Sequence, residues 1–178
     1  MFYPQRSNNP SDVSGRSGFR TNQYAQIVLV SEGNTTFDPC HHIREYEYLY
    51  GAVEPLTGEN FFLTMPYCNT NHMNAFLREL SKAYKDDIIL LVTDGARWHI
   101  SKTLIVPSNI ELLRIPPYTP EMNPIEQVWT YVRTQGFKNL AFQTFAAVED
   151  RLCEIVNLIT HEVIKSITSR QWIIDCFL

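Results

Sequence analysis

Apolar and polar residues alternate along two segments that flank a short stretch of turn residues. Residues 46–53 alternate with the two-residue period of a β-strand, and residues 61–65 form a second short apolar run. Between them, Pro55-Leu56-Thr57-Gly58 supplies a proline and a glycine, which favour a turn. The pattern therefore predicts an antiparallel hairpin.

Three other segments carry apolar residues at helical spacing. The first runs from Met73 to Tyr84 and follows the capping candidates Asn69-Thr70-Asn71. The second opens at Asn123-Pro124, where proline suits the first helical position, and the third covers about residues 144–168. All three patterns predict amphipathic helices that bury one face.

Two further apolar runs predict strands. Residues 88–92 are apolar throughout, which is typical of a strand covered on both faces, and residues 110–115 form a strand that two prolines close. The expected order is hairpin, helix, strand, short helix, strand, helix and helix, which predicts a mixed α/β domain with helices over a sheet. Residues 1–25 show neither period, and we interpret them as loop or disordered chain.

Composition limits the class of protein. The chain has 178 residues, of which 44% are hydrophobic, and its formal charge is −4. This length favours one domain with a sizeable core, and the hydrophobic fraction excludes a disordered tail. The apolar runs are too short to cross a membrane and the first residues lack a signal-peptide pattern, so we expect a cytoplasmic protein. No basic block predicts strong nucleic-acid binding by this chain alone.

The cysteines indicate neither a disulfide framework nor a zinc site. Cys40, Cys68, Cys153 and Cys176 are widely spaced and form no C-x-x-C pair, so buried thiols are expected. The run Cys40-His41-His42 has metal-binding residue types, but adjacent side chains seldom converge on one ion. We interpret it as loop structure.

Two acidic residues lie where the predicted elements favour a ligand site. Asp94 directly follows the buried strand at residues 88–92, and ligands of open α/β sheets gather at the carboxyl ends of strands. Glu126 lies in the first turn of the helix that opens at Asn123-Pro124, beside its apolar stripe. Two carboxylates that converge at one strand end suit Mg²⁺, which prefers one or two carboxylates with water and phosphate oxygens.

Each of these features also has a structural interpretation. Asp94 by itself fits a turn or cap residue. The spacing of Asn123 and Glu126 fits a capping box, in which the Glu126 side chain reaches back to the Asn123 backbone. His99 by itself fits a surface or cap position, and the alternating tyrosines of residues 46–50 fit sheet packing better than a base-stacking platform.

Two longer motifs carry a family resemblance. The first is Asp94-Gly-Ala-Arg-Trp-His99, and the second runs from Leu112 to Trp129 and contains Pro-Pro-Tyr-Thr-Pro-Glu-Met-Asn-Pro-Ile-Glu. Both closely resemble the DDE transposases of bacterial insertion sequences in the Tc/mariner superfamily. Residues 44–53 also resemble the second strand of that family, so the resemblance covers about residues 44–135.

The resemblance implies a ribonuclease H-like fold, in which helices flank a mixed sheet and three carboxylates hold two divalent metals, Mg²⁺ or Mn²⁺. Asp94 matches the second carboxylate of the family and Glu126 the third, so both would be catalytic residues and metal ligands. One metal would activate water or a DNA 3′-hydroxyl, and the other would stabilise the leaving oxygen. His99 matches a recurrent histidine of the family. Asn123-Pro124 would aim Glu126, and Trp129 would pack.

The chain departs from the family pattern at the first carboxylate. Asp12 is the nearest candidate, but Val13 stands where the family has Glu. Glu32 lies too near the next strand, and Asp38 has no strand character. The N-terminal helix-turn-helix region of the family is not evident either, which removes a source of DNA affinity.

These observations divide the chain into three regions and leave three functions open. The regions are an irregular or poorly matching segment (1–43), a DDE/ribonuclease H-like catalytic core (44–140) and a C-terminal helical region that packs on the core (141–178). The leading function is a transposase catalytic domain that cleaves and transfers DNA at transposon ends. We expect it to be a fragment of a decayed insertion sequence with incomplete DDE chemistry, because the first catalytic Asp and the helix-turn-helix region are not evident. The alternatives are a non-catalytic interaction or oligomerisation remnant and a stand-alone metal-dependent nuclease that recruits Asp12. A homodimer stays open, and no membrane partner is expected.

Overall fold

The described strands form one five-stranded sheet in the order β3-β2-β1-β4-β5. The computed structural model describes residues 17–28, 46–94, 101–116, 122–138, 140, 142, 144–171 and 175. The strands are β1 (Ser17–Val28), β2 (Tyr46–Val53), β3 (Asn60–Met65), β4 (Ile88–Thr93) and β5 (Ile110–Arg114). The helices are α1 (Thr70–Ala83), α2 (Ile125–Tyr131), α3 (Phe145–Leu158) and α4 (His161–Thr168), with a π-helix, η3 (Val132–Phe137), directly after α2.

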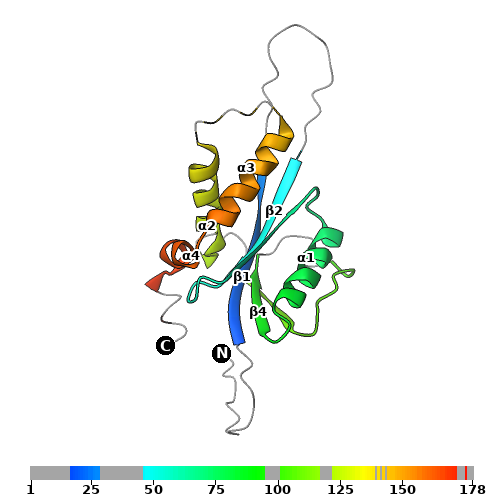
Figure 1. Ribbon diagram of the computed structural model, residues 1–178. Coiled ribbons are helices and arrows are strands. Elements are labelled where there is room, and N and C mark those ends of the chain that lie inside the picture. Colours follow the sequence, from blue (N-terminus) through cyan, green and yellow to red (C-terminus); the bar gives the residue numbers. More distant parts are fainter. Residues whose placement is uncertain are drawn as a thin grey trace.

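Helices cover both faces of the sheet (Figure 1). One face packs against α1, and the other packs against α2, α3 and α4. Leu49 and Val53 of β2 are buried among the residues of α2–α4, whereas Tyr50 and Ala52 are buried beneath α1. Successive strand residues point to opposite faces, so this distribution confirms the strand period predicted for residues 46–53.

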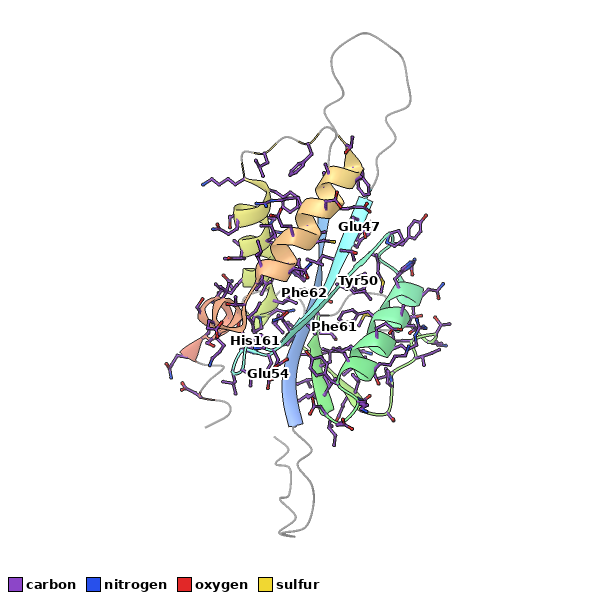
Figure 2. All side chains as sticks on the ribbon, in the orientation of Figure 1. Glu47, Tyr50, Glu54, Phe61, Phe62 and His161 are labelled. Atoms are coloured by element: carbon purple, nitrogen blue, oxygen red, sulfur yellow. The ribbon has the colours of Figure 1, made fainter. Side chains whose placement is uncertain are left out.

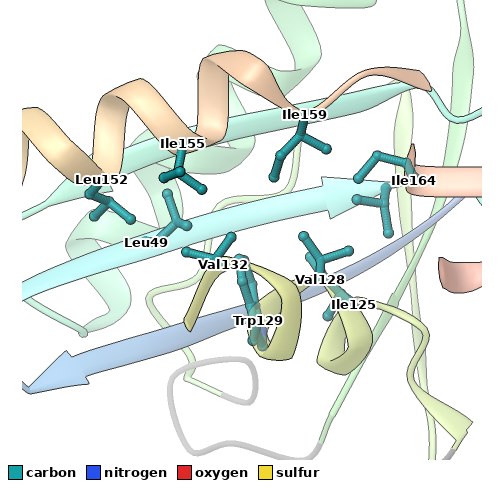
Figure 3. Close-up of a cluster of buried hydrophobic side chains, with 10 residues drawn as sticks. Leu49, Ile125, Val128, Trp129, Val132, Leu152, Ile155, Ile159 and Ile164 are labelled. Atoms are coloured by element: carbon teal, nitrogen blue, oxygen red, sulfur yellow. The ribbon is translucent and has the colours of Figure 1, made fainter. Parts of the chain in front are cut away.

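We call the buried set on the second face the α2–α4 cluster (Figure 3). Its members come from β2, from α2 and the first turn of η3, from α3, and from α4 with the linker before it. They are Leu49, Val53, Ile125, Val128, Trp129, Val132, Leu152, Ile155, Ile159 and Ile164. The cluster therefore joins the C-terminal helices to the sheet.

β1 is the central strand of the sheet, although its sequence shows no strand period. It pairs antiparallel with β2 and parallel with β4. The interpretation of residues 1–25 as loop or disordered chain is therefore wrong for residues 17–25, while residues 1–16 lie outside the described residues. A central strand makes backbone hydrogen bonds along both edges. These bonds stabilise the extended conformation of β1, although its residue pattern does not predict a strand.

The connection between β4 and β5 is held by asparagine side chains and contains no helix in residues 101–109. The Asn109 amide donates to three backbone carbonyl oxygens at the C-terminal end of α1. These are the oxygens of Ser81, Tyr84 and Asp87, at 3.4, 3.1 and 3.3 Å. The Asn74 amide of α1 donates to the backbone of the same connection. The short helix expected between the two strands is therefore wrong for residues 101–109, and residues 95–100 lie outside the described part.

The helical pattern over residues 144–168 forms two helices rather than one. The side-chain oxygens of Thr144 and Thr160 each accept a hydrogen bond from a backbone N–H three residues later, so they cap α3 and α4. Between the two helices, Ile159 has extended backbone and is only 6% exposed. A threonine cap offers the backbone an alternative to a continuous helix, and burial of Ile159 stabilises the bend.

The predicted hairpin of β2 and β3 is confirmed, and its turn packs against the C-terminal part of the chain. The turn closes with a hydrogen bond of 2.8 Å from the Gly58 N–H to the Glu54 carbonyl oxygen. Gly58 has a φ of 81°, in the left-handed region that favours glycine. The Ser169 hydroxyl donates to the Pro55 carbonyl oxygen at 2.7 Å. Figure 2 shows Glu54 and His161 beside this contact between the turn and α4.

The described residues also test two expectations from composition. Cys68 and Cys153 are free thiols, but Cys153 is exposed, so the expectation of buried thiols is wrong for that residue. Cys40 and Cys176 lie outside the described residues. In the part of the chain that the structure describes, no helix is both long enough and apolar enough to span a bilayer.

Candidate active site

Asp94 lies at the carboxyl end of a buried central strand, as the sequence predicted. The last residues of β4, Leu91, Val92 and Thr93, are all buried, and Asp94 follows them in a half-buried position. The backbone stays tied to the neighbouring strand at this point, because the Ile115 N–H donates to the Thr93 carbonyl oxygen at 2.9 Å. β4 is parallel to both β1 and β5, so this edge is where an open α/β sheet offers a ligand site.

Glu126 reaches the same region from α2. It is the second residue of that helix and is half-buried, while Ile125, Val128 and Trp129 on either side of it are buried in the α2–α4 cluster (Figure 3). The apolar stripe therefore anchors α2 on the sheet and leaves Glu126 at the margin of the buried face. This placement agrees with the position predicted from the helical period.

The two carboxylates are close enough to affect each other. The pKa of Glu126 is raised, and burial is the largest cause. The positive charge of Arg133, further along the same helical run, lowers this pKa, whereas the negative charge of Asp94 raises it. Like charges that face one another in a partly dehydrated place favour protonation of one of them. The structure thus brings together the two residues that the motifs singled out.

The capping-box interpretation of Glu126 is wrong. Asn123 is 1% exposed, and neither its Oδ1 nor its Nδ2 has a hydrogen-bond partner among the described residues. Only backbone atoms meet at this helix start, where the Glu126 N–H donates to the Asn123 carbonyl oxygen at 3.2 Å. A capping box requires the Asn123 side chain to accept from a helix N–H, so the box is not formed and Glu126 has no capping role to explain it.

Glu126→Gln is expected to stabilise the metal-free protein by less than about 1 kcal/mol at neutral pH. Because the pKa of Glu126 is raised on folding, its ionised form opposes folding, and stability falls as pH rises from the unfolded pKa through the folded pKa. The amide removes this loss. Urea unfolding of parent and variant between pH 4 and pH 8 measures it, with the exposed Glu111→Gln as the matched control. A gain that does not grow with pH would contradict the burial of a charged Glu126.

The loop after β3 also reaches this region, which the sequence analysis missed. Burial raises the pKa of the Cys68 thiol, a hydrogen bond with Tyr50 lowers it, and the charge of Asp94 raises it. Arg133 was missed as well, although its spacing of seven residues from Glu126 puts both on one helical face. That spacing was the available signal for Arg133, whereas only the sheet order brings Cys68 near Asp94.

The remaining sequence candidates divide into two groups. Tyr50 is 0% exposed and its ring lies 5.6 Å from that of Phe76, so the sheet-packing interpretation is confirmed for this tyrosine. Trp129 packs as expected. The other candidates lie outside the described residues: Asp12, Glu32, Asp38, Cys40, His41, His42 and His99.

The donor set suits one divalent cation. Asp94 and Glu126 provide two carboxylates close enough for their charges to interact, and two is a number that Mg²⁺ commonly uses. Within the described ranges, no group of three His, Cys, Asp or Glu side chains is placed to hold a metal. β1 contains no Asp or Glu in its whole length, and its Asn22 pairs with Thr93, the residue before Asp94. The described residues therefore offer a ligand pair for one metal but no third carboxylate for a second.

Comparisons with known proteins agree with this geometry. The family model described as DDE superfamily endonuclease matches residues 15–149, so the similarity includes β1 and extends beyond residues 44–135. An uncharacterised protein of Sinorhizobium fredii (strain NBRC 101917 / NGR234), y4pE/y4sA, is 35% identical over 130 residues, which are 71% of this chain and 96% of that protein.

Solved structures show a similar fold. A Mos1 transposase paired-end complex with the left transposon end has a TM-score of 0.59 at 15% identity over 84% of this chain. The Mos1 strand transfer complex has a TM-score of 0.57 at 14% identity over 83% of this chain. The chain spans about half of each solved protein, 51% and 49%.

These findings confirm the family that the two motifs indicated. The sheet order, the helices on both faces and the structural neighbours identify the fold as ribonuclease H-like. The match over residues 15–149 covers most of the chain and includes Asp94 and Glu126. The chain belongs to the DDE superfamily endonucleases.

Proposed function

We propose that this chain is the catalytic domain of an insertion-sequence transposase, in which Asp94 and Glu126 hold a Mg²⁺ or Mn²⁺ ion and act on DNA phosphodiesters. The proposal rests on the positions of these two carboxylates, one after the end of β4 and one in the first turn of α2, close enough for the charge of Asp94 to raise the pKa of Glu126. A divalent cation held there would supply electrostatic stabilisation to a phosphate that undergoes displacement.

The residues of the chain contribute position and charge. Asp94 is fixed by the backbone ladder of β4, and Glu126 is fixed by the apolar stripe of α2. A bound cation would offset the repulsion between the two carboxylates, which favours binding. Arg133 is exposed and close enough to lower the pKa of Glu126, so its guanidinium adds positive charge beside the site.

DNA is the proposed partner, and the transposon end is the proposed substrate. The solved relatives are named as transposase complexes, one with a transposon end. The formal charge of −4 predicts weak DNA affinity for this chain alone, because phosphate neutralisation supplies most non-specific affinity. A protein that acts on bacterial DNA works in the cytoplasm, and a homodimer would bring two such sites to two DNA ends.

A second candidate is a domain that keeps this fold without catalysis. The observation in its favour is β1, which has no acidic residue beside the end of β4. Asp12 is the candidate that would restore a third carboxylate in the nuclease alternative. If the chain is a non-catalytic oligomerisation domain, size-exclusion chromatography with light scattering should give an oligomer, and a strict monomer would count against it.

A plasmid-nicking assay with Mn²⁺ tests catalysis. We expect the parent to nick supercoiled DNA, and Asp94→Asn and Glu126→Gln each to lower the rate by more than about 100-fold, since even outer partners of metal ligands are worth about 10- to 100-fold. Glu111→Gln, an exposed carboxylate on β5, is the matched control and should keep parental activity.

Each outcome of this assay decides between the candidates. Folded parent protein without Mn²⁺-dependent nicking would refute catalysis by this chain and support the non-catalytic candidate. Nicking that survives in Asp94→Asn would refute the assignment of the site. Loss of nicking in Asp12→Asn as well would add that residue to the catalytic set.

A further inference from the structure

Gly51 lies where two aromatic rings approach the sheet. It is in the middle of β2, pairs with Phe62 of β3, and is buried. A Cβ atom placed on Gly51 would lie 2.7 Å from Cη2 of Trp129 and 2.7 Å from Cε1 of Phe62. Both distances are shorter than real Cβ contacts allow, so any other residue at this position would move the rings or the elements that carry them.

The two rings differ in the space around them: Trp129 is enclosed, whereas Phe62 is partly exposed and can turn toward solvent. Trp129 is 1% exposed and belongs to the buried α2–α4 cluster, in which Figure 3 shows it on α2. Phe62 is partly buried against the same cluster and meets the indole at a centroid distance of 6.1 Å and an interplanar angle of 63°. Packed interiors respond to an added methyl group by shifting side chains and backbone. A Cβ at Gly51 would therefore push Trp129, and α2 with it, away from the sheet.

The same helix carries the candidate metal ligand. Glu126 precedes Trp129 by three residues, which is just under one helical turn, so both lie on neighbouring parts of one helix face. The helix also contacts β1 and β2, the strand of Gly51. The height of the Trp129 ring above β2 thus determines how far α2 lies from the sheet and how far Glu126 lies from Asp94 at the end of β4.

We infer that Gly51 is a positioning residue: its missing side chain seats Trp129 on β2, and this contact sets the separation of Glu126 and Asp94. The inference deepens the proposed function and rests on it for the role of the carboxylate pair. Gly51 acts on the two carboxylates indirectly, through its contact with Trp129. A purely structural glycine would change stability without changing the interaction between the two acids.

The test measures that interaction directly in the metal-free protein. A double-mutant cycle with Asp94→Asn and Glu126→Gln, followed by urea unfolding, gives the coupling between the two carboxylates. The cycle is run in the parent, in Gly51→Ala, in Trp129→Phe, and in the double variant Gly51→Ala/Trp129→Phe. The double variant lacks the Cη2 atom of the indole, and its remaining close contact is with Phe62, which is partly exposed and can turn toward solvent. Gly136→Ala is the matched control, because its added Cβ would crowd Ile155 at 3.0 Å in the same helical layer.

We expect the repulsive coupling to shrink toward zero in Gly51→Ala, to return in Gly51→Ala/Trp129→Phe, and to stay at the parental value in Gly136→Ala. Mn²⁺ titration of the same proteins should show an affinity about 10-fold lower for Gly51→Ala, with recovery in the double variant. If Gly51→Ala does not fold, the double variant decides. Coupling that differs between Trp129→Phe and the double variant supports the inference, because the added Cβ then changes the separation of the two acids, and equal coupling in both overturns it.

Other outcomes separate this inference from the proposed function. Parental coupling in a destabilised Gly51→Ala would overturn the positioning role and leave the metal site intact. A parent that binds no Mn²⁺ would refute the metal site, while the metal-free cycle would still decide whether Gly51 sets the Glu126–Asp94 separation.

Discussion

Trp129→Ala is expected to lower the free energy of unfolding by about 3–5 kcal/mol, the usual loss when a large aromatic side chain is removed from a core. The indole is 1% exposed, belongs to the α2–α4 cluster (Figure 3), and packs against Gly51 of β2 and Phe62 of β3. A domain has only about 5–15 kcal/mol of stability, so this single change would remove a large share of it. Urea unfolding followed by far-UV circular dichroism measures the effect.

Trp129→Phe is the informative comparison for this prediction. Nε1 of the indole is buried and has no hydrogen-bond partner among the described residues, and an unpaired buried N–H costs about 1–3 kcal/mol. Phenylalanine has no N–H and therefore removes that cost, although its ring is smaller than the indole and fills less of the core. We expect Trp129→Phe to lower the free energy of unfolding far less than Trp129→Ala does. Leu158→Ala, at a position 64% exposed on α3, should stay within about 0.5 kcal/mol of the parent. A Trp129→Ala protein as stable as the parent would show that the cluster does not hold the fold together.

Gly58→Ala is expected to be the most damaging substitution in the β2–β3 turn, with a loss of more than about 2 kcal/mol. Its φ of 81° alone costs a residue with a side chain about 1–2 kcal/mol. In addition, an added Cβ would overlap the His161 carbonyl oxygen and lie 2.7 Å from the His161 carbonyl carbon. Because the obstacle is backbone at the start of α4, either the turn or the helix must move. Urea unfolding gives the loss, and hydrogen exchange over residues 161–168 reports whether α4 detaches.

Gly58→Asn separates the two causes in that prediction. Asparagine tolerates the left-handed region better than alanine does, but it carries the same Cβ toward His161. We expect both variants to be strongly destabilised, with faster exchange in α4. An asparagine variant close to the parent in stability would mean that backbone conformation alone, and not the contact with α4, makes Gly58 necessary.

The candidate site was predictable as far as it depended on local pattern. Asp94 follows an apolar strand and Glu126 opens an amphipathic helix, and the structure places both as those patterns predicted. The local pattern also suggested a capping box for Glu126, which is not formed, because the buried amide of Asn123 makes no hydrogen bond with any described residue. Sequence spacing can indicate a cap, but the direction of a buried side chain depends on the elements packed around it.

The strand conformation of β1 could not be predicted from its residues, for a physical reason. The segment Ser17–Val28 lacks alternation, so its residues alone indicate a loop. Its strand conformation comes from hydrogen bonds to β2 on one edge and β4 on the other, both supplied by residues that follow it by about 20 residues or more. The asparagine contacts of the β4–β5 connection were missed for the same reason, since they join residues more than 20 positions apart. The break at Thr160 is different, because its cap is a local hydrogen bond from the Val163 N–H.

The sequence by itself determined the hairpin, the buried strand that ends at Asp94, the helix that carries Glu126 and the family to which these motifs belong. Periodicity and turn residues act over a few neighbours, so one chain segment contains all the information they need. Only the tertiary structure decided that β1 lies between β2 and β4, that Asp94 and Glu126 come close enough for their charges to interact, and that Gly51 leaves room for Trp129. Those features require segments that are far apart in the chain to meet. The packing of the whole fold then determines which side chains contact, repel or bury one another.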